Sequence, residues 1–274
     1  MNEKTRMQLR WNLHTHTPRC HHARGTEEEM IRAAIEAGLN TMGFADHAPM
    51  FCEDGFVSGI RMRLEELPGY VEILRKLRKK YAGVIEIPIG LEAEYFPDVF
   101  DTFLDYIKKE GVEFLILGQH YLGNEQDSPY VGRETKDEGF LRYYVDQICE
   151  AMDTGAFTYV AHPDLLFFSG DETAYAREMR RLARHAAERG MPLEFNLNGA
   201  RDNRNYPDPG FWRIAGEEGV KAVIGIDAHN PGFVNIPDAE EKCRKMAEEA
   251  GVPILERVPL VKLFGDVPQG KTDD

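Results

Sequence analysis

Apolar runs rich in Val, Ile, Leu and Phe alternate along this chain with amphipathic stretches of helical spacing. Short apolar runs are typical of buried strands, and repeated strand–helix units predict a mainly parallel sheet covered by helices. We expect strands over residues 7–14, 41–46, 84–91, 113–118, 157–161, 192–197 and 221–226. The amphipathic stretches predict helices over residues 26–37, 62–81, 98–109, 137–153, 172–190, 208–219 and 237–250.

Consecutive strand–helix units close most simply into a barrel, and an α/β barrel typically takes about 250 residues. The 274 residues of this chain fit one such barrel, and no linker, low-complexity tract or repeat divides them. Thr26 and Glu29 have the spacing of a capping box at the start of the first helix, and Gly38 suits its end. We therefore expect one α/β domain over residues 1–274, a distorted seven-stranded (βα)7 barrel similar to the TIM barrel.

The charge balance limits the class of partner. The chain carries 33 basic and 47 acidic residues, a formal net charge of −14, which disfavours nucleic acid and anionic membranes and favours a small molecule. No stretch approaches the about 18 apolar residues of a membrane span, and the first residues lack the apolar core of a signal peptide, which favours a cytoplasmic protein. The cysteines are few and widely spaced, so we expect reduced thiols at Cys20, Cys52, Cys149 and Cys243.

Histidine and acidic residues gather where the apolar runs end. Six of the seven expected strands have His, Asp or Glu as the last residue or within two residues after it, at the carboxyl end where barrel enzymes place their active sites. Residues two apart in a strand point to the same side, so His14 and His16 can converge on one point, as can Asp227 and His229. So many buried imidazoles and carboxylates must face water, pair or hold metal. Of the nine histidines, only His185 stands outside this pattern.

Mixed nitrogen and oxygen donors narrow the kind of metal. The chain lacks a set of thiolates, which disfavours a closed structural zinc site, whereas imidazole and carboxylate suit Zn²⁺, Fe²⁺ or Mn²⁺ with positions open for water and substrate. About ten candidate ligands are too many for one ion at ordinary coordination numbers. The sequence therefore predicts a catalytic centre with two or three divalent ions, two of which share the carboxylate of Glu92.

Short motifs follow one another at these strand ends: His14-Thr-His16-Thr-Pro-Arg-Cys20-His-His22, Phe44-Ala-Asp-His-Ala-Pro49, Gly90-Leu-Glu-Ala-Glu-Tyr95, Gln119-His120, Ala161-His162, Glu194-Phe-Asn-Leu-Asn-Gly199 and Gly225-Ile-Asp-Ala-His229. In this order they resemble the motifs of the polymerase and histidinol phosphatase (PHP) family, and most of all its histidinol-phosphatase branch. The resemblance spans nearly the whole chain. It implies a distorted seven-stranded βα barrel with a trinuclear metal site, which hydrolyses L-histidinol phosphate to L-histidinol and phosphate in histidine biosynthesis.

The resemblance also implies three groups of metal ligands. A first metal would be held by His14, His16, Glu92 and Asp227, a second by Glu92, His120 and His162, and a third by His22, His47 and His229. Two positions are ambiguous from the residues alone. His21 sits beside His22, and the family's third histidine, six residues after the first pair, selects His22. Glu94 shares a strand face with Glu92, and the family's Gly-Leu-Glu motif selects Glu92 as the bridge.

Polar residues near the same rim are candidate substrate contacts. Arg201 resembles a phosphate-binding arginine of the family, because a guanidinium can hold two phosphoryl oxygens, although Arg204 is close by and could serve instead. Asp46 and Glu94 could meet the cationic groups of histidinol or orient metal-bound histidines. A further set shares one strand face and could contact substrate or support the ligands: Glu194, Asn196 and Asn198.

We expect a metal-dependent phosphomonoesterase in which a metal-bridging hydroxide attacks phosphorus in line with the leaving alkoxide. Asp227 and Glu92 are the expected catalytic ligands, and Asp46 is a candidate acid for the leaving group. The expected substrate contacts are Arg201, Asn196 and Glu94. The alternatives are a PHP phosphoesterase for a nucleotide, sugar phosphate or other ester, a polymerase-associated PHP module, and a protein that stores or senses metal. The acidic balance disfavours the polymerase module, and the candidate phosphate-binding arginine disfavours metal storage.

Overall fold

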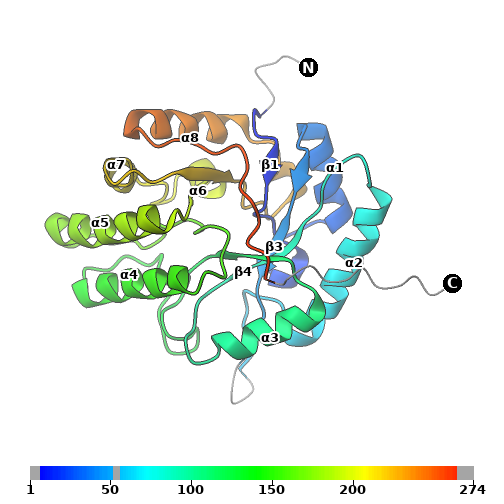
Figure 1. Ribbon diagram of the computed structural model, residues 1–274, viewed down its shortest axis with the longest axis horizontal. Helices are drawn as coiled ribbons and strands as arrows, with labels where there is room; N and C mark the ends of the chain where they lie inside the picture. Colours follow the sequence, from blue (N-terminus) through cyan, green and yellow to red (C-terminus); the bar gives the residue numbers. More distant parts are fainter. Residues whose placement is uncertain (1–6, 52–55, 264–274) are drawn as a thin grey trace.

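Short parallel strands lie inside a ring of helices in the computed structural model, which describes residues 7–51 and 56–263 (Figure 1). The hydrogen-bonded order is β1-β2, β3-β4-β5 and β6-β7, and every pairing is parallel. The strand–helix alternation predicted from the sequence is confirmed. The strands are β1 Trp11–Asn12, β2 Thr41–Met42, β3 Phe44–His47, β4 Ile89–Ala93, β5 Phe114–Leu117, β6 Leu193–Asn196 and β7 Ala222–Gly225.

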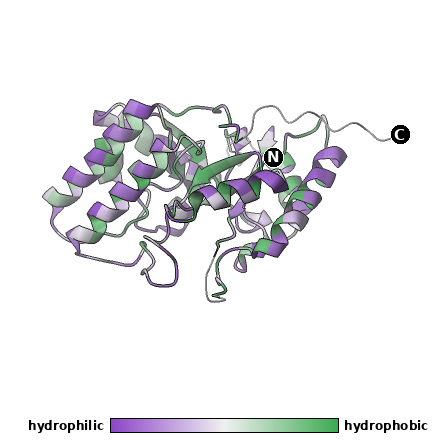
Figure 2. Cartoon of the chain, turned by 60° about the horizontal axis from the view of Figure 1, so that its bottom comes forward, coloured by the Kyte–Doolittle hydropathy of each residue, from purple (hydrophilic) through white to green (hydrophobic). Residues whose placement is uncertain are grey.

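The long helices fall on the predicted amphipathic stretches. The capping box of the first helix is present at Thr26 and Glu29, and Gly38 ends that helix with a φ of 90°. Each long helix carries both hydrophilic and hydrophobic residues along its length, which is typical of amphipathic outer helices (Figure 2). The helices are α1 Glu27–Ala37, α2 Leu67–Lys80, α3 Phe100–Glu110, α4 Glu138–Asp153, α5 Glu172–Arg189, α6 Leu197–Asp202, α7 Pro209–Glu217 and α8 Pro237–Ala250, with 3-10 turns at Pro18–Cys20, Leu64–Glu66 and Pro231–Phe233.

The expected seven-stranded barrel is not present as one closed sheet in the part of the chain that the structure describes. The strands form three small sheets instead. The expected strand over 157–161 is reduced to single bridges from Val160 to Leu117 and to Leu193. Where β1 would continue, the Asn12 side chain accepts the backbone N–H of Ile226 at 2.9 Å. A side chain there replaces a ladder bond, which shortens the sheet.

Two further boundaries differ from the prediction. The expected strand over 41–46 divides at Gly43, where the chain leaves β1 and joins β4. A Cβ at Gly43 would lie 3.0 Å from the Leu13 Cα atom, so only glycine allows this close approach. After β6, no helix was expected before residue 208, but α6 begins at once because the Asn196 side chain accepts the N–H of Gly199 at 2.9 Å as an N-cap.

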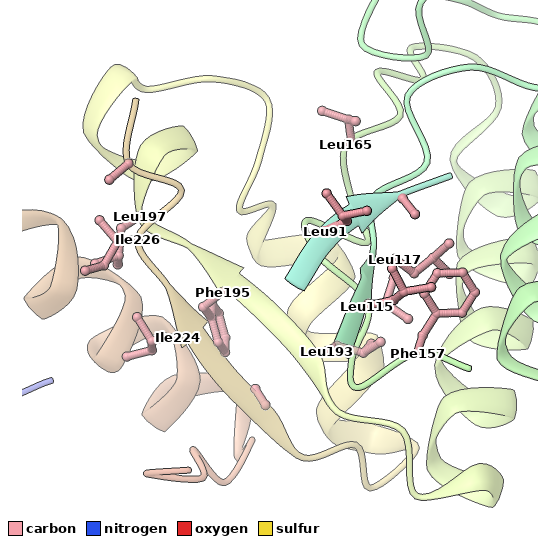
Figure 3. Packing of buried hydrophobic residues seen from close by; sticks show 14 of the residues in the cluster. Leu91, Leu115, Leu117, Phe157, Leu165, Leu193, Phe195, Leu197, Ile224 and Ile226 are labelled. Carbon is pink, nitrogen blue, oxygen red and sulfur yellow. The ribbon is translucent and has the colours of Figure 1, made fainter. Parts of the chain in front are cut away.

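Alternate strand residues enter two apolar layers. Leu115 and Leu117 of β5 pack outward in the layer between strands and helices (Figure 3), whereas Phe114 and Ile116 point to the inside. The inner cluster also includes Val258 from the segment after α8. Full burial of such a side chain contributes about 1.5–3 kcal/mol to stability. Because protein interiors are closely packed, this inner cluster forms a packed floor beneath the strand ends.

Among the described helices, none is both long and apolar enough to cross a membrane. Cys20, Cys149 and Cys243 are free thiols, as predicted, and Cys52 lies outside the described residues.

Candidate metal centre

The strand-end histidines and acids converge, as the parallel topology requires. His47, the last residue of β3, is the register partner of Glu92 in β4, so the two side chains lie on the same face. His120 follows β5, and Asp227 follows β7. The isolated bridge between Thr15 and Ala228 brings the segment after β1 beside the segment after β7. The carboxyl ends of strands from both halves of the chain therefore meet at one place.

Glu92 lies at the middle of the imidazoles. Its Oε2 is 3.0 Å from the Nδ1 of His47, and its Oε1 is 2.8 Å from the Nε2 of His162. The Nε2 atoms of His14, His16 and His120 lie 3.5, 3.6 and 3.6 Å from the same carboxylate. Glu94, the alternative bridge, lies 3.5 Å from the Nδ1 of His120 on the side of that ring away from Glu92, so the geometry favours Glu92 as the central carboxylate.

Asp227 forms the second acidic point of the cluster. Its Oδ1 lies 3.0 Å from the Nε2 of His16 and 3.2 Å from the Nδ1 of His229. Asp227 and His162 both have positive φ, 54° and 30°, although neither is glycine. Such backbone strain persists where the surroundings impose it, and it concentrates at functional sites.

His22, not His21, reaches this cluster. The Nε2 of His22 lies 3.0 Å from the Nε2 of His229, and its Nδ1 is 2.6 Å from the carbonyl oxygen of Cys20. His21 instead ends the 3-10 turn Pro18–Cys20 in a left-handed conformation with a φ of 65°. Two imidazole nitrogens that face each other at this distance can both point toward one ion.

The residues fit a metal cluster because their donor atoms are buried and lack partners. Atoms without a hydrogen bond include His14 Nε2, His16 Nε2, His47 Nδ1, Glu92 Oε2 and Asp227 Oδ1. Buried polar atoms of native proteins are otherwise satisfied, so orphans that face one another indicate an ion. The triplets close enough to share one include His14-His16-Glu92, His47-Glu92-His120, His16-His47-His229 and Cys20-His22-His229. These triplets cut across the expected grouping, since His47 lies against Glu92 and His120.

The charges of the cluster offset one another. Burial alone would raise the pKa of Glu92, but His120, His14 and His47 hold it well below its usual range. Burial would likewise lower the pKa of His16, yet the carboxylates of Asp227 and Asp46 beside the ring raise it to about 9. The carboxylates therefore stay ionised and require positive charge beside them, which divalent ions supply when they displace the imidazole protons.

A layer of acids behind the histidines fixes the rings. The Glu194 Oε1 lies 2.8 Å from the Nδ1 of His14, which leaves Nε2 free for the cluster. Two glycines make room for the acids: a Cβ at Gly118 would lie 1.9 Å from an oxygen of Glu92, and a Cβ at Gly225 would lie 1.7 Å from an oxygen of Glu194.

Three residues expected to meet substrate lie in this layer, and they do not line the cavity into which the cluster opens. The Asp46 carboxylate lies 3.3 Å from the Nδ1 of His16 and also accepts the hydroxyl of Thr17. Glu94 accepts a hydrogen bond from the guanidinium Nη2 of Arg61 at 2.9 Å. Asn196 donates to Asp227 at 3.2 Å. These contacts favour the other role expected of the three side chains, which is to orient the candidate ligands, while their contact with substrate stays a prediction.

The cluster opens into a cavity of about 490 Å³. Arg201 and Arg204 both line it, so both remain candidates for phosphate. Arg201 is held in place: its Nη2 donates to Asn198 at 2.6 Å, and its guanidinium stacks 3.8 Å above the Phe233 ring. Arg204 Nη1 donates to the Tyr206 hydroxyl at 3.0 Å.

Sequence reasoning missed part of the cavity wall. Tyr121, Tyr130 and Arg133 lie in the segment between β5 and α4, which has no strand or helix periodicity. Its length was the available signal, because long irregular loops in compact domains are often functional. The full lining is His22, His47, Ile60, Glu92, His120, Tyr121, Tyr130, Arg133, His162, Asn198, Arg201, Arg204, Tyr206, Asp227, His229 and Phe233.

Asp164 supports the wall from behind. Its Oδ2 accepts the backbone N–H of Asp208 at 2.6 Å, two residues beyond Tyr206. Burial raises the pKa of Asp164 to about 7, although the hydrogen bond from Asp208 acts in the opposite direction. Between pH 3.8 and about pH 7, Asp164 therefore keeps a proton in the folded protein that it would release in the unfolded chain.

We expect Asp164→Asn to raise the melting temperature more at pH 8 than at pH 5. The unfolded carboxyl ionises near 3.8 and the folded one near pH 7, so stability falls as the pH rises between these values and stays lowered above them. An amide carries no such cost. Thermal unfolding of both proteins in excess chelator, which removes any contribution of metal release, measures the difference. Equal shifts at the two pH values would show that ionisation is not the cause.

Comparison with known proteins gives a family and a fold. The profile of the PHP domain matches residues 12–198, more than half of the chain. A relative from Deinococcus radiodurans named "Probable histidinol-phosphatase" is 33% identical over 236 residues, which cover 83% of this chain and 89% of the relative. The histidinol-phosphatase of Bacillus subtilis is 27% identical over 251 residues, with 81% and 94% covered.

A solved structure has the same fold. The histidinol phosphate phosphatase of Lactococcus lactis, crystallised with zinc, L-histidinol and phosphate, superposes with a TM-score of 0.71 at 17% identity. The match covers 91% of this chain and 98% of that chain. The α/β arrangement of short strands and outer helices is therefore that of a known phosphatase fold.

Proposed function

This chain belongs to the PHP family, and on that basis we propose that it is a metal-dependent phosphatase that hydrolyses L-histidinol phosphate to L-histidinol and phosphate. The observation that carries the proposal is the set of buried, partnerless imidazole and carboxylate atoms that face one another at the floor of an arginine-lined cavity. The names of the Deinococcus, Bacillus and Lactococcus proteins support histidinol phosphate as the substrate.

We propose that two or three divalent ions, zinc, manganese or iron, occupy this cluster. The ligands would be those of the sequence prediction: His14, His16, His22, His47, Glu92, His120, His162, Asp227 and His229. The ions would offset the charge of the phosphate and make water a nucleophile near neutral pH. His47 belongs to two of the observed triplets, one with Glu92 and His120 and one with His16 and His229. We therefore assign ligands to individual ions by these triplets.

The protein's own residues bind and orient the ester. Arg201 is suited to hold phosphoryl oxygens because Asn198 and Phe233 already fix its guanidinium, which reduces the entropy lost on binding. Arg204 adds a second positive charge on the same wall. Glu92 and Asp227 stay ionised, since the pKa of each lies well below its usual range. Asp46 lies 3.3 Å from the Nδ1 of His16, and its role as the acid for the leaving group stays a prediction.

The isolated bridges support a finer view of the fold. Val160 links β5 to β6, and Thr15 is bridged to Ala228 after β7. We propose that these contacts make the three small sheets a strongly distorted (βα)7 barrel. The distortion leaves irregular backbone at the strand ends, which is where the candidate ligands lie.

The test is phosphate release from L-histidinol phosphate by protein of measured metal content. We expect turnover that is lost in excess chelator and restored when zinc, manganese or iron is added back. A phosphomonoester panel that includes a nucleotide and a sugar phosphate, assayed beside it, decides the substrate. A much higher kcat/KM for another ester would replace histidinol phosphate, and full metal content without hydrolysis of any ester would favour a metal-storage protein.

A further inference from the structure

We propose that Arg61 is a positioning residue that ties a cavity loop to the metal cluster through two acids, Glu94 and Glu125. The inference rests on the proposed function for its meaning, but part of its test does not need turnover. Arg61 belongs to no strand-end motif, and its place in the structure gives it a role that its position in the sequence does not indicate.

The Arg61 side chain is 2% exposed, which is exceptional for arginine. Its Nη1 and Nη2 grip the two oxygens of Glu94, the latter at 2.9 Å, while its Nε donates to Glu125 at 2.7 Å. The guanidinium therefore uses both edges of its fork at once. The side chains of the two acids are also nearly buried, at 2% and 7% exposed.

On one side, the contact chain leads to a candidate metal ligand. The Oε1 of Glu94 lies 3.5 Å from the Nδ1 of His120, and the Nε2 of the same ring faces Glu92 at 3.6 Å. A carboxylate behind a ligating histidine sets the orientation of its ring. Because Arg61 fixes both oxygens of Glu94, the position of His120 depends on Arg61 at one remove.

On the other side, the contact chain leads to the cavity wall. Glu125 also accepts the hydroxyl of Ser58 at 2.8 Å, and the Ser58 oxygen accepts the N–H of Ile60 at 3.1 Å. Ile60 lines the cavity, as does Tyr121, four residues before Glu125. Arg61 thus joins the segment 58–61 to the segment 121–125, and both form part of the surface that a substrate would touch.

Lysine cannot replace this arginine. A guanidinium offers donors along two edges in a fixed plane, whereas an ammonium is a compact charge that cannot grip two carboxylates with the same geometry. Arg61→Lys keeps the charge, so neither acid is left as an uncompensated buried ion, the most destabilising outcome. It removes only the two-edged grip.

For Arg61→Lys we expect two separable losses. One ion per chain should leave at a chelator concentration about 10-fold lower or more, since loss of the support behind a ligand typically lowers metal affinity 10–100-fold. The KM for histidinol phosphate should rise as well. The metal readout is the ion content after dialysis against graded chelator, so it is measured whether or not the ester is a substrate.

Two single variants separate the arms. Glu94→Gln should shift the chelator midpoint and leave KM nearly unchanged at saturating metal, whereas Glu125→Gln should raise KM and leave the chelator midpoint unchanged. These variants decide the proposal even if Arg61→Lys does not fold. The matched control is Arg78→Lys, because Arg78 grips Glu113 with two bonds of 2.7 and 2.8 Å on the outside of the fold.

The proposal is overturned if Arg61→Lys behaves like Arg78→Lys in both chelator midpoint and KM, or if Glu94→Gln and Glu125→Gln produce the same change. A merely structural role would lower the melting temperature without the split between metal affinity and KM. Absence of turnover on every ester would reject the proposed function and leave the chelator measurement to decide whether Arg61 positions His120.

Discussion

Glu92→Gln is expected to remove nearly all phosphatase activity, with a fall in kcat/KM on the order of 10³-fold or more. The substitution preserves shape but removes a charge that faces five imidazoles within 3.6 Å. An amide is a poor ligand for divalent ions and cannot offset their charge. A loss of several kcal/mol of charge stabilisation corresponds to such a factor in rate.

The measurement is the hydrolysis rate together with bound metal per chain, for the variant and for Glu217→Gln. Glu217 forms a half-exposed ion pair with Arg180 on the outer helices, so its loss should change stability by at most about 1 kcal/mol and leave activity intact. Wild-type metal content and rate in Glu92→Gln would reject the central place given to this carboxylate.

Gly118→Ala is expected to lower kcat/KM by about 10²-fold while the protein still folds. The added Cβ would lie 1.9 Å from one Glu92 oxygen and 2.6 Å from its Cδ, so the carboxylate must move. It would also lie 2.7 Å from the Glu92 Cγ, so the outer part of this side chain has to shift, but no backbone atom is among these contacts and the fold tolerates the change. The metal cluster is less tolerant, because a misplacement of ~1 Å at a reacting centre can cost about 10²-fold.

Gly69→Ala is the matched control. It is the same substitution in α2, where a Cβ would meet nothing within 4 Å. We expect wild-type activity and a gain of ~0.5–1 kcal/mol in unfolding free energy, because alanine favours a helix. Circular dichroism and thermal unfolding report the fold, and dialysis reports the metal. If Gly118→Ala binds metal and turns over as Gly69→Ala does, the contact with Glu92 does not govern the site.

The convergence of the ligands could be predicted because it depends on two simple properties. Side chains two apart share a strand face, and parallel strands present their carboxyl ends together. His14 and His16 meet the prediction, and His47 meets Glu92 in register. What the residues alone could not predict is which acid lies at the middle of the imidazoles. Glu94 is a carboxylate on the same strand face as Glu92, but the distance of each from the histidines depends on how the strands pack.

The sequence did not predict a role for Arg61 or for the tyrosines that line the cavity, and the reason is different. They lie in segments without periodicity, where side-chain direction depends on tertiary contacts such as the pair Arg61–Glu125. The sequence also predicted more continuous strand pairing than the structure shows, for a related reason. Apolar runs indicate buried backbone, but they do not show which group pairs with each backbone N–H. The Asn12 side chain takes the place of a neighbouring strand as acceptor for Ile226, and the hydrophobic pattern does not indicate such a contact.

The packed inner floor has a consequence for how the centre is loaded. Leu13, Phe114, Ile116, Tyr159 and Val223 are fully buried beneath the ligands, so ions cannot pass through from the amino ends of the strands. Metal ions must then enter and leave by the cavity that the ester also uses. A bound ester or product would stand in the exit path of the ions, so occupancy of the cavity should slow the removal of metal by chelator as well as compete with substrate.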